Sequence, residues 1–204
     1  MTKLIIDQLG NSKKNVTLSV EKNESLVYFL LGTKPGDKNI TVELNGRNAQ
    51  AKILGAILGI EGSSNIKTFQ HHRAPNTKSD LLINGVFINR TSYNYQGMIK
   101  IDPKAQKSNA YQKNNNLLLS DHAHVDTSPE LEILADDVRC THGTTVGRID
   151  EENIFYLMSR GITKKDAEKL VIGGFLKSVV ADLGDISAKK KIEIILDKEI
   201  NKLN

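Results

Sequence analysis

The sequence predicts a mainly β protein that ends in a small α-helical part. Short stretches rich in β-branched and aromatic residues follow one another through the first part of the chain, separated by Gly, Asn, Asp, Ser or Pro. No apolar stripe with the 3.6-residue period of a helix occurs before Asp150, and such stripes follow it. We therefore expect a β domain over residues 1–149 and a helical domain over residues 150–204.

Nine stretches are expected to form strands, and two arrangements of them fit the sequence. A β-sandwich is favoured by the Asn-Gly pairs at 45–46 and 84–85, because this dipeptide suits tight hairpins. A β-solenoid is favoured by irregular strand spacing and Asn-rich corners. The pattern alone does not choose between them. The nine stretches are VTLSV (16–20), LVYFLLG (26–32), NITVEL (39–44), AKILGAILGI (51–60), DLLINGVFI (80–88), GMIKI (97–101), NLLLS (116–120), LEIL (131–134) and DVRCTH (137–142).

The first predicted helix has clear start and stop signals. Asp150 is a suitable N-cap, and the two glutamates that follow it lie where the helix dipole favours negative charge. The segment ENIFYLMSR continues the helix, and Gly161 is a suitable C′ residue.

Two further helices are expected after it. Thr163 caps the second, with Asp166 at N3, and the Gly173–Gly174 pair predicts a kink or close packing in its middle. Ser187 is expected to cap the third, which carries one apolar stripe. About 55 residues are few for an independent core, so we expect the helices to pack on the β domain, on a partner, or on both. The stripe comprises Ile192, Ile195, Leu196, Ile200 and Leu203.

Composition and charge argue against several classes of function. The 204 residues carry a net charge of +4, but the lysines are scattered and aromatic residues are only 5% of the chain, which disfavours nucleic-acid binding. No apolar run approaches the roughly 20 residues of a membrane span. The segment GTKPGDK (32–38) lacks the spacing of a phosphate-binding loop, so we expect no nucleotide hydrolysis by this chain itself.

The cysteine count and the N-terminus favour a cytoplasmic protein. A single cysteine excludes an intrachain disulfide. The first residues, MTKLIIDQLGN, turn polar after six positions and do not resemble a signal peptide. A reducing, cytoplasmic location is the simplest expectation.

The single cysteine, Cys140, lies two residues before His142. On a strand their side chains would project from the same face, with Cα atoms roughly 6–7 Å apart. That pair can supply two ligands to a soft or borderline metal centre, but a tetrahedral zinc or Fe–S site usually needs four. The rest would come from another chain, from sulfide or from distant histidines and carboxylates. Alternatively, Cys140 is a small buried residue that only packs.

The other histidines give weaker signals for a metal site. His71 and His72 are adjacent, so on a strand they would face opposite ways and could not easily bind one ion. His122 and His124 have the alternation for a shared face but flank a turn-rich segment, which favours a solvated edge.

Two catalytic arrangements are also disfavoured. Asp136 and Asp137 are consecutive, and on a strand their side chains would point apart, so we expect one to cap or bend a turn and the other to be solvated. A Cys–His nucleophilic pair needs converging side chains, whereas residues two apart on a strand are parallel.

Several motifs lie close together within residues 109–162, namely AYQ, NLLLS, PELEILADDVRCTHGTTVG and FYLMSRGI, and HHRAPNTKS lies upstream of them. Together these motifs resemble the SufB/SufD family of Fe–S cluster assembly proteins. The run C-x-H-G-x-T-V-G resembles the SufD branch. The chain is about half the usual family length, which indicates a short SufD-like form.

The resemblance implies a fold and a function. The family fold is a right-handed parallel β-helix followed by a C-terminal helical domain, which decides by resemblance between sandwich and solenoid. The family role is that of a scaffold subunit without enzymatic activity. It pairs through its β-helix with a SufB subunit, or here with a second copy, and docks the SufC ATPase through its helices. A β-solenoid interaction module with no direct role in cluster ligation is the alternative.

The resemblance also implies site residues. His142, a candidate metal ligand, matches a histidine near the subunit interface, and Cys140 matches the neighbouring cysteine. Both are therefore candidate ligands for a transient Fe–S cluster or iron, and no tightly bound cofactor is expected in the isolated chain. No nucleic acid or membrane partner is expected. Four helix residues match the SufC-docking region: Phe155, Tyr156, Phe175 and Leu176.

Overall fold

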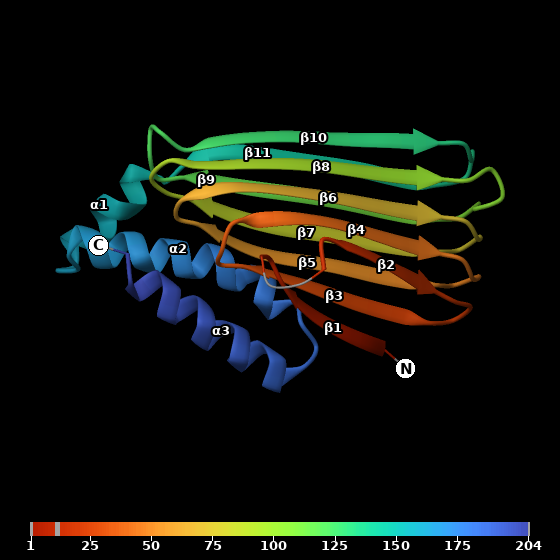
Figure 1. Ribbon diagram of the computed structural model, residues 1–204, viewed down its shortest axis with the longest axis horizontal. Coiled ribbons are helices and arrows are strands. Elements are labelled where there is room, and N and C mark those ends of the chain that lie inside the picture. Colours follow the sequence, from red (N-terminus) through yellow and green to blue (C-terminus); the bar gives the residue numbers. More distant parts are fainter. Residues whose placement is uncertain (1, 11–12, 204) are drawn as a thin grey trace.

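The chain forms eleven strands followed by three helices, as described for residues 2–10 and 13–203 in a computed structural model (Figure 1). The helices are α1 (Glu151–Ser159), α2 (Lys164–Ala181) and α3 (Ile186–Asn201). The strands are β1 (Thr2–Gln8), β2 (Asn15–Val20), β3 (Ser25–Gly32), β4 (Gly36–Leu44), β5 (Gln50–Gly59), β6 (Gly62–His72), β7 (Lys78–Phe87), β8 (Thr91–Ile101), β9 (Asn109–Leu118), β10 (His124–Ile133) and β11 (Arg139–Arg148).

Successive strands alternate between two sheets. One sheet has the order β1-β3-β5-β7-β9-β11 and the other has the order β10-β8-β6-β4-β2. All the strand pairs within them are parallel. The chain therefore winds as a parallel β-helix, which confirms the solenoid. We call the two sheets the odd sheet and the even sheet.

The expectation of hairpins at the two Asn-Gly pairs is wrong. Asn84 and Gly85 lie inside β7, and the pair at 45–46 lies in the corner after β4. A Cβ atom on Gly85 would come within 2.6 Å of the Phe87 ring, so this glycine is required by packing inside the strand. The dipeptide therefore marks a close approach here instead of a reversal of chain direction.

Asparagine forms several of the corners, as the Asn-rich segments predicted. Asn23, Asn48, Asn76 and Asn89 all have positive φ, the left-handed region that asparagine tolerates better than other non-glycine residues. Stacked corners also bind one another, since Asn48 Nδ2 donates to Asn23 Oδ1 at 2.9 Å. The corners thereby help to set the register from one turn of the β-helix to the next.

Two hydrophobic clusters stabilise the fold. The first fills the β-helix interior and includes Tyr28, Ile53 and Tyr95. The second lies between the outer face of the odd sheet and helices α2 and α3, where residues such as Leu54 contact a helical set that includes Leu176. The helices thus share a core with the β-helix, as their small size predicted (Figure 1).

The helix boundaries agree with two of the three predicted caps. Asp150 accepts from the backbone N–H of Glu152 at 2.9 Å, and Thr163 accepts from that of Asp166 at 3.2 Å. The third expectation is wrong: Asp185, not Ser187, caps α3, because its carboxylate accepts from the Ala188 N–H at 2.8 Å. Across the described residues, no helix combines the length and hydropathy that a membrane span requires.

Helix α2 continues through both of its central glycines. Gly173 is buried, and a Cβ atom there would lie 3.9 Å from Ile200 Cδ1 of α3, which is ordinary contact. A Cβ atom on Gly174 would meet open space. Gly173 therefore lies at the α2–α3 contact, Gly174 faces outward, and neither interrupts the helix.

Candidate functional site

The last turn of the β-helix, formed by β10 and β11, leaves this end of the helix open (Figure 1). Within the described chain β10 pairs with β8 alone and β11 pairs with β9 alone. Each strand is ten residues long and has one unpaired backbone edge, which can template a further strand. Large apolar side chains are exposed here, namely Leu131, Ile133, Leu134 and Val146.

Cys140 and His142 lie on β11 and face the interior of this open end. Cys140 is in register with Ala110 and His142 with Gln112, and both β9 residues are buried inside the β-helix. The two side chains therefore continue the interior columns of the preceding turn. They share a face, as their two-residue spacing predicts.

The Cys140 thiol is half-buried in a small apolar cluster. It packs beside Val138 against buried residues that include Ile99 and Ala110. Burial raises the pKa of this thiol. In the isolated chain at neutral pH the sulfur is therefore mainly protonated, and a nearby cation or metal ion would be needed to stabilise the thiolate.

His142, by contrast, is exposed, and the residue in register with it on β9 is polar. The Gln112 side chain beneath it donates to the Gly97 carbonyl at 3.3 Å. Two residues further along β11, the Thr144 hydroxyl lies 2.8 Å from the Thr127 hydroxyl of β10. This contact joins the two sheets across the open end. The imidazole of His142 is thus accessible from solvent, and its strand is held to β10 by the contact between Thr144 and Thr127.

The interior below this site becomes polar towards the open end. Buried side chains there include Gln70, Asn114 and Asn116, whereas the interior of the first turns is mainly aliphatic and aromatic. Asn114 and Asn116 are bound to each other, Nδ2 of Asn116 donating to Oδ1 of Asn114 at 2.8 Å. Gln70 Oε1 and Asn116 Oδ1 are buried and have no hydrogen-bond partner among the described residues.

The remaining predicted ligands do not join this pair. Across residues 2–10 and 13–203, no group of three or more His, Cys, Asp or Glu side chains is placed to hold a metal ion. His122 and His124 are both exposed near the start of β10. The described chain therefore offers no third candidate ligand beside Cys140 and His142.

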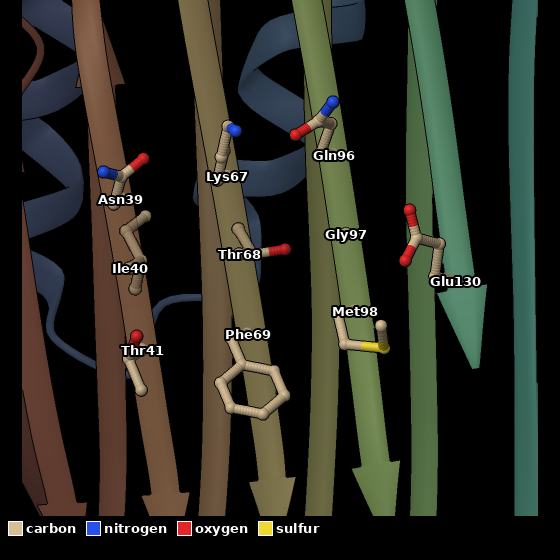
Figure 2. A pocket seen from close by; sticks show the side chains of 10 residues that line it. All are labelled: Asn39, Ile40, Thr41, Lys67, Thr68, Phe69, Gln96, Gly97, Met98 and Glu130. Atoms are coloured by element: carbon tan, nitrogen blue, oxygen red, sulfur yellow. The ribbon is translucent and has the colours of Figure 1, made fainter. Parts of the chain in front are cut away.

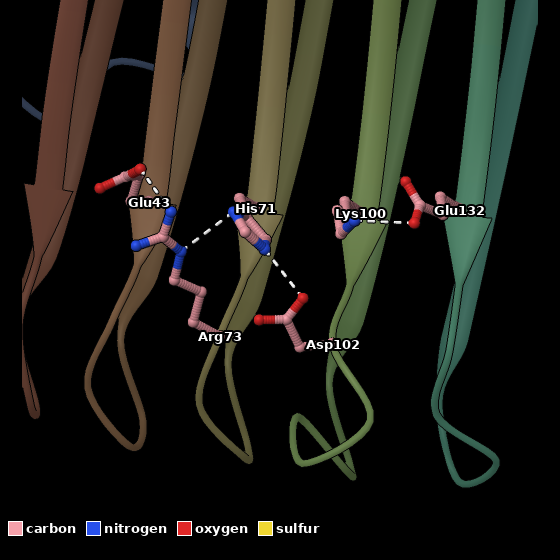
Figure 3. Close-up of polar contacts among 6 residues, drawn as sticks. All are labelled: Glu43, His71, Arg73, Lys100, Asp102 and Glu132. Atoms are coloured by element: carbon pink, nitrogen blue, oxygen red, sulfur yellow. Dashed lines mark hydrogen bonds and ion pairs between the residues drawn. The ribbon is translucent and has the colours of Figure 1, made fainter.

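His71 and His72 face opposite sides of β6, as predicted. His71 lies on the outer face, where its Nε2 is 2.9 Å from Asp102 and its Nδ1 accepts from Arg73 Nε at 3.0 Å (Figure 3). His72 is buried inside, with Nδ1 2.7 Å from the Thr77 hydroxyl and Nε2 2.8 Å from that of Ser79. Burial, with a smaller effect of the neighbouring histidine, lowers the pKa of His72 to about 4. The HHRAPNTKS segment is thus a hydrogen-bonded corner.

Asp136 and Asp137 lie in the bend between β10 and β11, with both side chains exposed. The Asp137 N–H donates to Gln106 Oε1 at 2.9 Å, and its carbonyl accepts from the Lys107 N–H at 2.6 Å. The pair shapes a corner and does not form an acid/base site.

The four helix residues differ in their exposure. Phe155 and Tyr156 on α1 are 74% and 57% exposed, and the Arg160 guanidinium lies 5.2 Å from the centre of the Tyr156 ring. Phe175 is half-buried, and Leu176 is fully buried between α2 and the odd sheet. Of these four residues, the two exposed ones therefore both lie on α1.

A shallow hollow on the outer face of the even sheet was missed by sequence reasoning (Figure 2). It has a volume of about 260 Å³, and its lining includes Phe69, Met98 and Glu130. Strand β6, which crosses it, was not among the expected strands. The β-branched and aromatic residues Ile66, Thr68 and Phe69 are a strand signal, but apolar and polar residues do not alternate here because the buried Thr68 and Gln70 are polar.

Comparisons with known proteins identify a family for this chain. The family described as "SUF system FeS cluster assembly, SufBD core domain" matches residues 9–175. "Iron-sulfur cluster assembly protein SufD" of Escherichia coli (strain K12) is 36% identical over 165 residues, covering 80% of this chain and 39% of that protein. The protein of the same name from Bacillus subtilis (strain 168) is 38% identical over 140 residues, covering 69% of this chain and 32% of that protein.

The chain thus spans less than two fifths of the length of these two relatives. The family match covers most of the β-helix, the open end, α1 and the first two thirds of α2. On this match and these identities, the chain belongs to the SufB/SufD family of iron–sulfur cluster assembly proteins, and it is SufD-like.

Proposed function

We propose that this chain is a non-enzymatic scaffold subunit of a SUF-type complex that assembles Fe–S clusters. It pairs through the open end of its β-helix with a SufB-like subunit or with a second copy, and it docks a SufC-like ATPase through its helices. ATP hydrolysis belongs to that ATPase. The observation that carries the proposal is the position of Cys140 and His142 inside the open last turn.

The chemistry of the two candidate ligands supports a site that this chain and a partner chain form together around the cluster being assembled. Thiolate and imidazole suit iron and Fe–S clusters, and such centres need more ligands than one chain provides here. A partner that covers the open end would place its own residues opposite Cys140 and His142. In this proposal His142, which is exposed, contacts the nascent cluster or its iron, and Cys140 becomes a ligand once the site is closed.

The unpaired edges support pairing through this end. Ile133 is 41% exposed on β10, and Ile6 is 43% exposed on β1 at the opposite end. The proposal predicts that Ile133→Asp abolishes co-purification with the SufB-like subunit. The matched change Ile6→Asp should leave the complex intact. Equal yields of complex for both variants would refute pairing through the β10–β11 end.

The exposed aromatic residues of α1 support docking of the ATPase there. Deleting the helices is not a usable test, because it would uncover the apolar outer face of the odd sheet. Phe155→Asp with Tyr156→Asp should instead prevent co-purification of the ATPase. Ile186, which is 81% exposed on α3, provides the control variant Ile186→Asp. Retention of the ATPase by the α1 variant would place its docking surface elsewhere.

The raised pKa of Cys140 favours the alternative, an interaction module whose Cys–His pair is inert. Both readings predict an intact complex when Cys140→Ser and His142→Ala are combined. Only the scaffold with ligands predicts a loss of iron and sulfide bound per complex, which separates the two.

A further inference from the structure

We propose that the outer face of β10 selects a partner whose adjoining edge strand is basic, and that it disfavours end-to-end pairing between two copies of this chain. This inference rests on the proposed use of the open end as a subunit interface. It concerns which partner the end accepts, a choice between a second copy and a different chain.

Three carboxylates line the outer face of this edge strand. Asp126, Glu130 and Glu132 are in register with Asn94, Met98 and Lys100 of β8. The residues between them on β8, such as Tyr95 and Ile99, are buried inside the β-helix, so the carboxylates lie on its outer face. All three are next to the unpaired backbone edge, where a partner strand would bind.

Two of these carboxylates lack an ion-pair partner within the part of the chain that the structure describes. Glu132 is paired, since its Oε1 lies 2.7 Å from Lys100 Nζ (Figure 3). Among residues 2–10 and 13–203, no basic side chain forms an ion pair with Asp126 or Glu130. Figure 2 shows Glu130 at the β10 side of the hollow, two strands away from Lys67. The charge of Asp126 and Glu130 is therefore available to a partner.

The order of charges across the even sheet indicates the sign of the next residue. In register, Glu43 of β4 is followed by His71 of β6, Lys100 of β8 and Glu132 of β10. Arg73 bridges the first two, donating to Glu43 at 2.8 Å and to His71 at 3.0 Å (Figure 3). The row ends in the carboxylate of Glu132, so a basic residue at the next position, on the partner strand, would have the opposite charge.

The acidic outer face of β10 differs from the outer faces of two other edge strands. The outward residues of β2, at the other edge of the even sheet, are Asn15, Thr17 and Ser19. Those of β11 are Arg139, Thr141, Gly143, Thr145 and Gly147, of which only Arg139 is charged. The open end therefore has one acidic edge and one edge without outward carboxylates.

Symmetry makes this acidic edge unfavourable for a homodimer. If two copies pair through β10 around a two-fold axis with the interior continuous, the strands run antiparallel and each contact occurs twice. With the axis at Ser128, Asp126 of one copy faces Glu130 of the other, in both directions. Like charges directly opposite on neighbouring strands are destabilising, and opposite charges are stabilising. With a basic partner strand, Asp126 and Glu130 would face opposite charges, and the same contacts would be attractive.

The first experiment neutralises the two unpaired carboxylates in the full chain. Asp126→Asn with Glu130→Gln should strengthen self-association about tenfold and weaken binding to the SufB-like subunit about tenfold, the size expected for two cross-strand contacts. Glu61→Gln with Glu193→Gln changes the net charge equally on other elements and should alter neither quantity. Sedimentation velocity measures self-association, and titration of the labelled subunit measures binding.

The second experiment supplies a basic edge of known sequence. A copy with Asp126→Lys and Glu130→Lys, mixed with the wild-type chain, should form a 1:1 pair more tightly than either protein forms with itself. Equal association in the mixture and in the separate samples would overturn the proposal. The proposal would also be overturned if Asp126→Asn with Glu130→Gln left binding to the SufB-like subunit unchanged. In that case the proposed pairing through the open end would still stand. A wild-type chain that binds no SufB-like subunit and no copy of itself would instead refute the proposed pairing.

Discussion

The Nδ1 atom of His72 lies 2.7 Å from the Oγ1 atom of Thr77, in a buried corner where Ser79 and Ser108 complete a chain of hydroxyl contacts. Burial lowers the pKa of His72 from 6.5 to about 4, so the folded protein holds the imidazole neutral. Above pH 6.5 the imidazole is neutral in both the folded and the unfolded chain, so His72 does not reduce the free energy of unfolding. As the pH falls towards 4, the unfolded chain takes up a proton that the folded protein does not, and the free energy of unfolding decreases.

We therefore expect the free energy of unfolding to fall by about 3 kcal/mol between pH 7 and pH 4 through this residue. Urea unfolding of the wild-type chain and of His72→Gln over this range measures the effect, because the variant lacks the titrating group. His122→Gln, which changes an exposed histidine, should keep the wild-type pH profile. A wild-type profile in His72→Gln would contradict the assignment.

The interior ion pair near the first turn gives a second prediction. Lys38 is 1% exposed, its Nζ lies 2.5 Å from Asp7, and the Tyr28 hydroxyl donates to the same carboxylate at 2.7 Å. Asp7→Asn removes the charge that compensates a buried ammonium, so we expect a loss of about 3 kcal/mol in chemical unfolding. The exposed pair of Lys14 and Asp37 is the control, and Asp37→Asn should have a much smaller effect.

Gly97 gives a third prediction, since its lack of a side chain makes room for two interior groups. A Cβ atom there would lie 2.3 Å from Gln112 Nε2 and 2.5 Å from the Tyr95 hydroxyl. Gly97→Ala should therefore lower the free energy of unfolding by about 1–3 kcal/mol. On β11, Gly143→Ala meets nothing within 4 Å and should change stability little. Equal effects of the two substitutions would show that the interior is looser than described.

The thiol of Cys140 gives a fourth prediction, through its rate of alkylation. Because burial raises its pKa, the rate constant with iodoacetamide should rise with pH along a curve displaced to higher pH than that of free cysteine. Stopped samples analysed by mass spectrometry give the rate at each pH. A curve displaced to lower pH would show a stabilised thiolate in the isolated chain.

The helical part was the more predictable half of the fold. Asp150 and Thr163 are caps in the structure, because capping depends on residues that are close in sequence. The cap of α3 was missed by two residues, since Asp185 and Ser187 are both good N-cap types. The β-helix itself came from resemblance to a family, because strand pairing joins residues 20 to 40 apart and local pattern does not specify the partner.

The candidate site was predictable only in part. The shared face of Cys140 and His142 follows from strand alternation, but the open end that they face depends on which turn is last. Strand β10 was expected only over 131–134, because Pro129 and the acidic residues read as a loop, although an edge strand tolerates proline. The burial of Leu176 could not be read from its helix alone, since both faces of α2 carry apolar residues.

The central claim is that His142 contacts the cluster being assembled at the covered open end. The direct measurement is iron and sulfide bound per complex, after reconstitution of the full chain with its SufB-like subunit and SufC-like ATPase. With His142→Ala in an intact complex, we predict a loss of cluster loading, while His124→Ala, an exposed histidine on β10, keeps the wild-type value. Unchanged loading in the intact His142→Ala complex would contradict the claim.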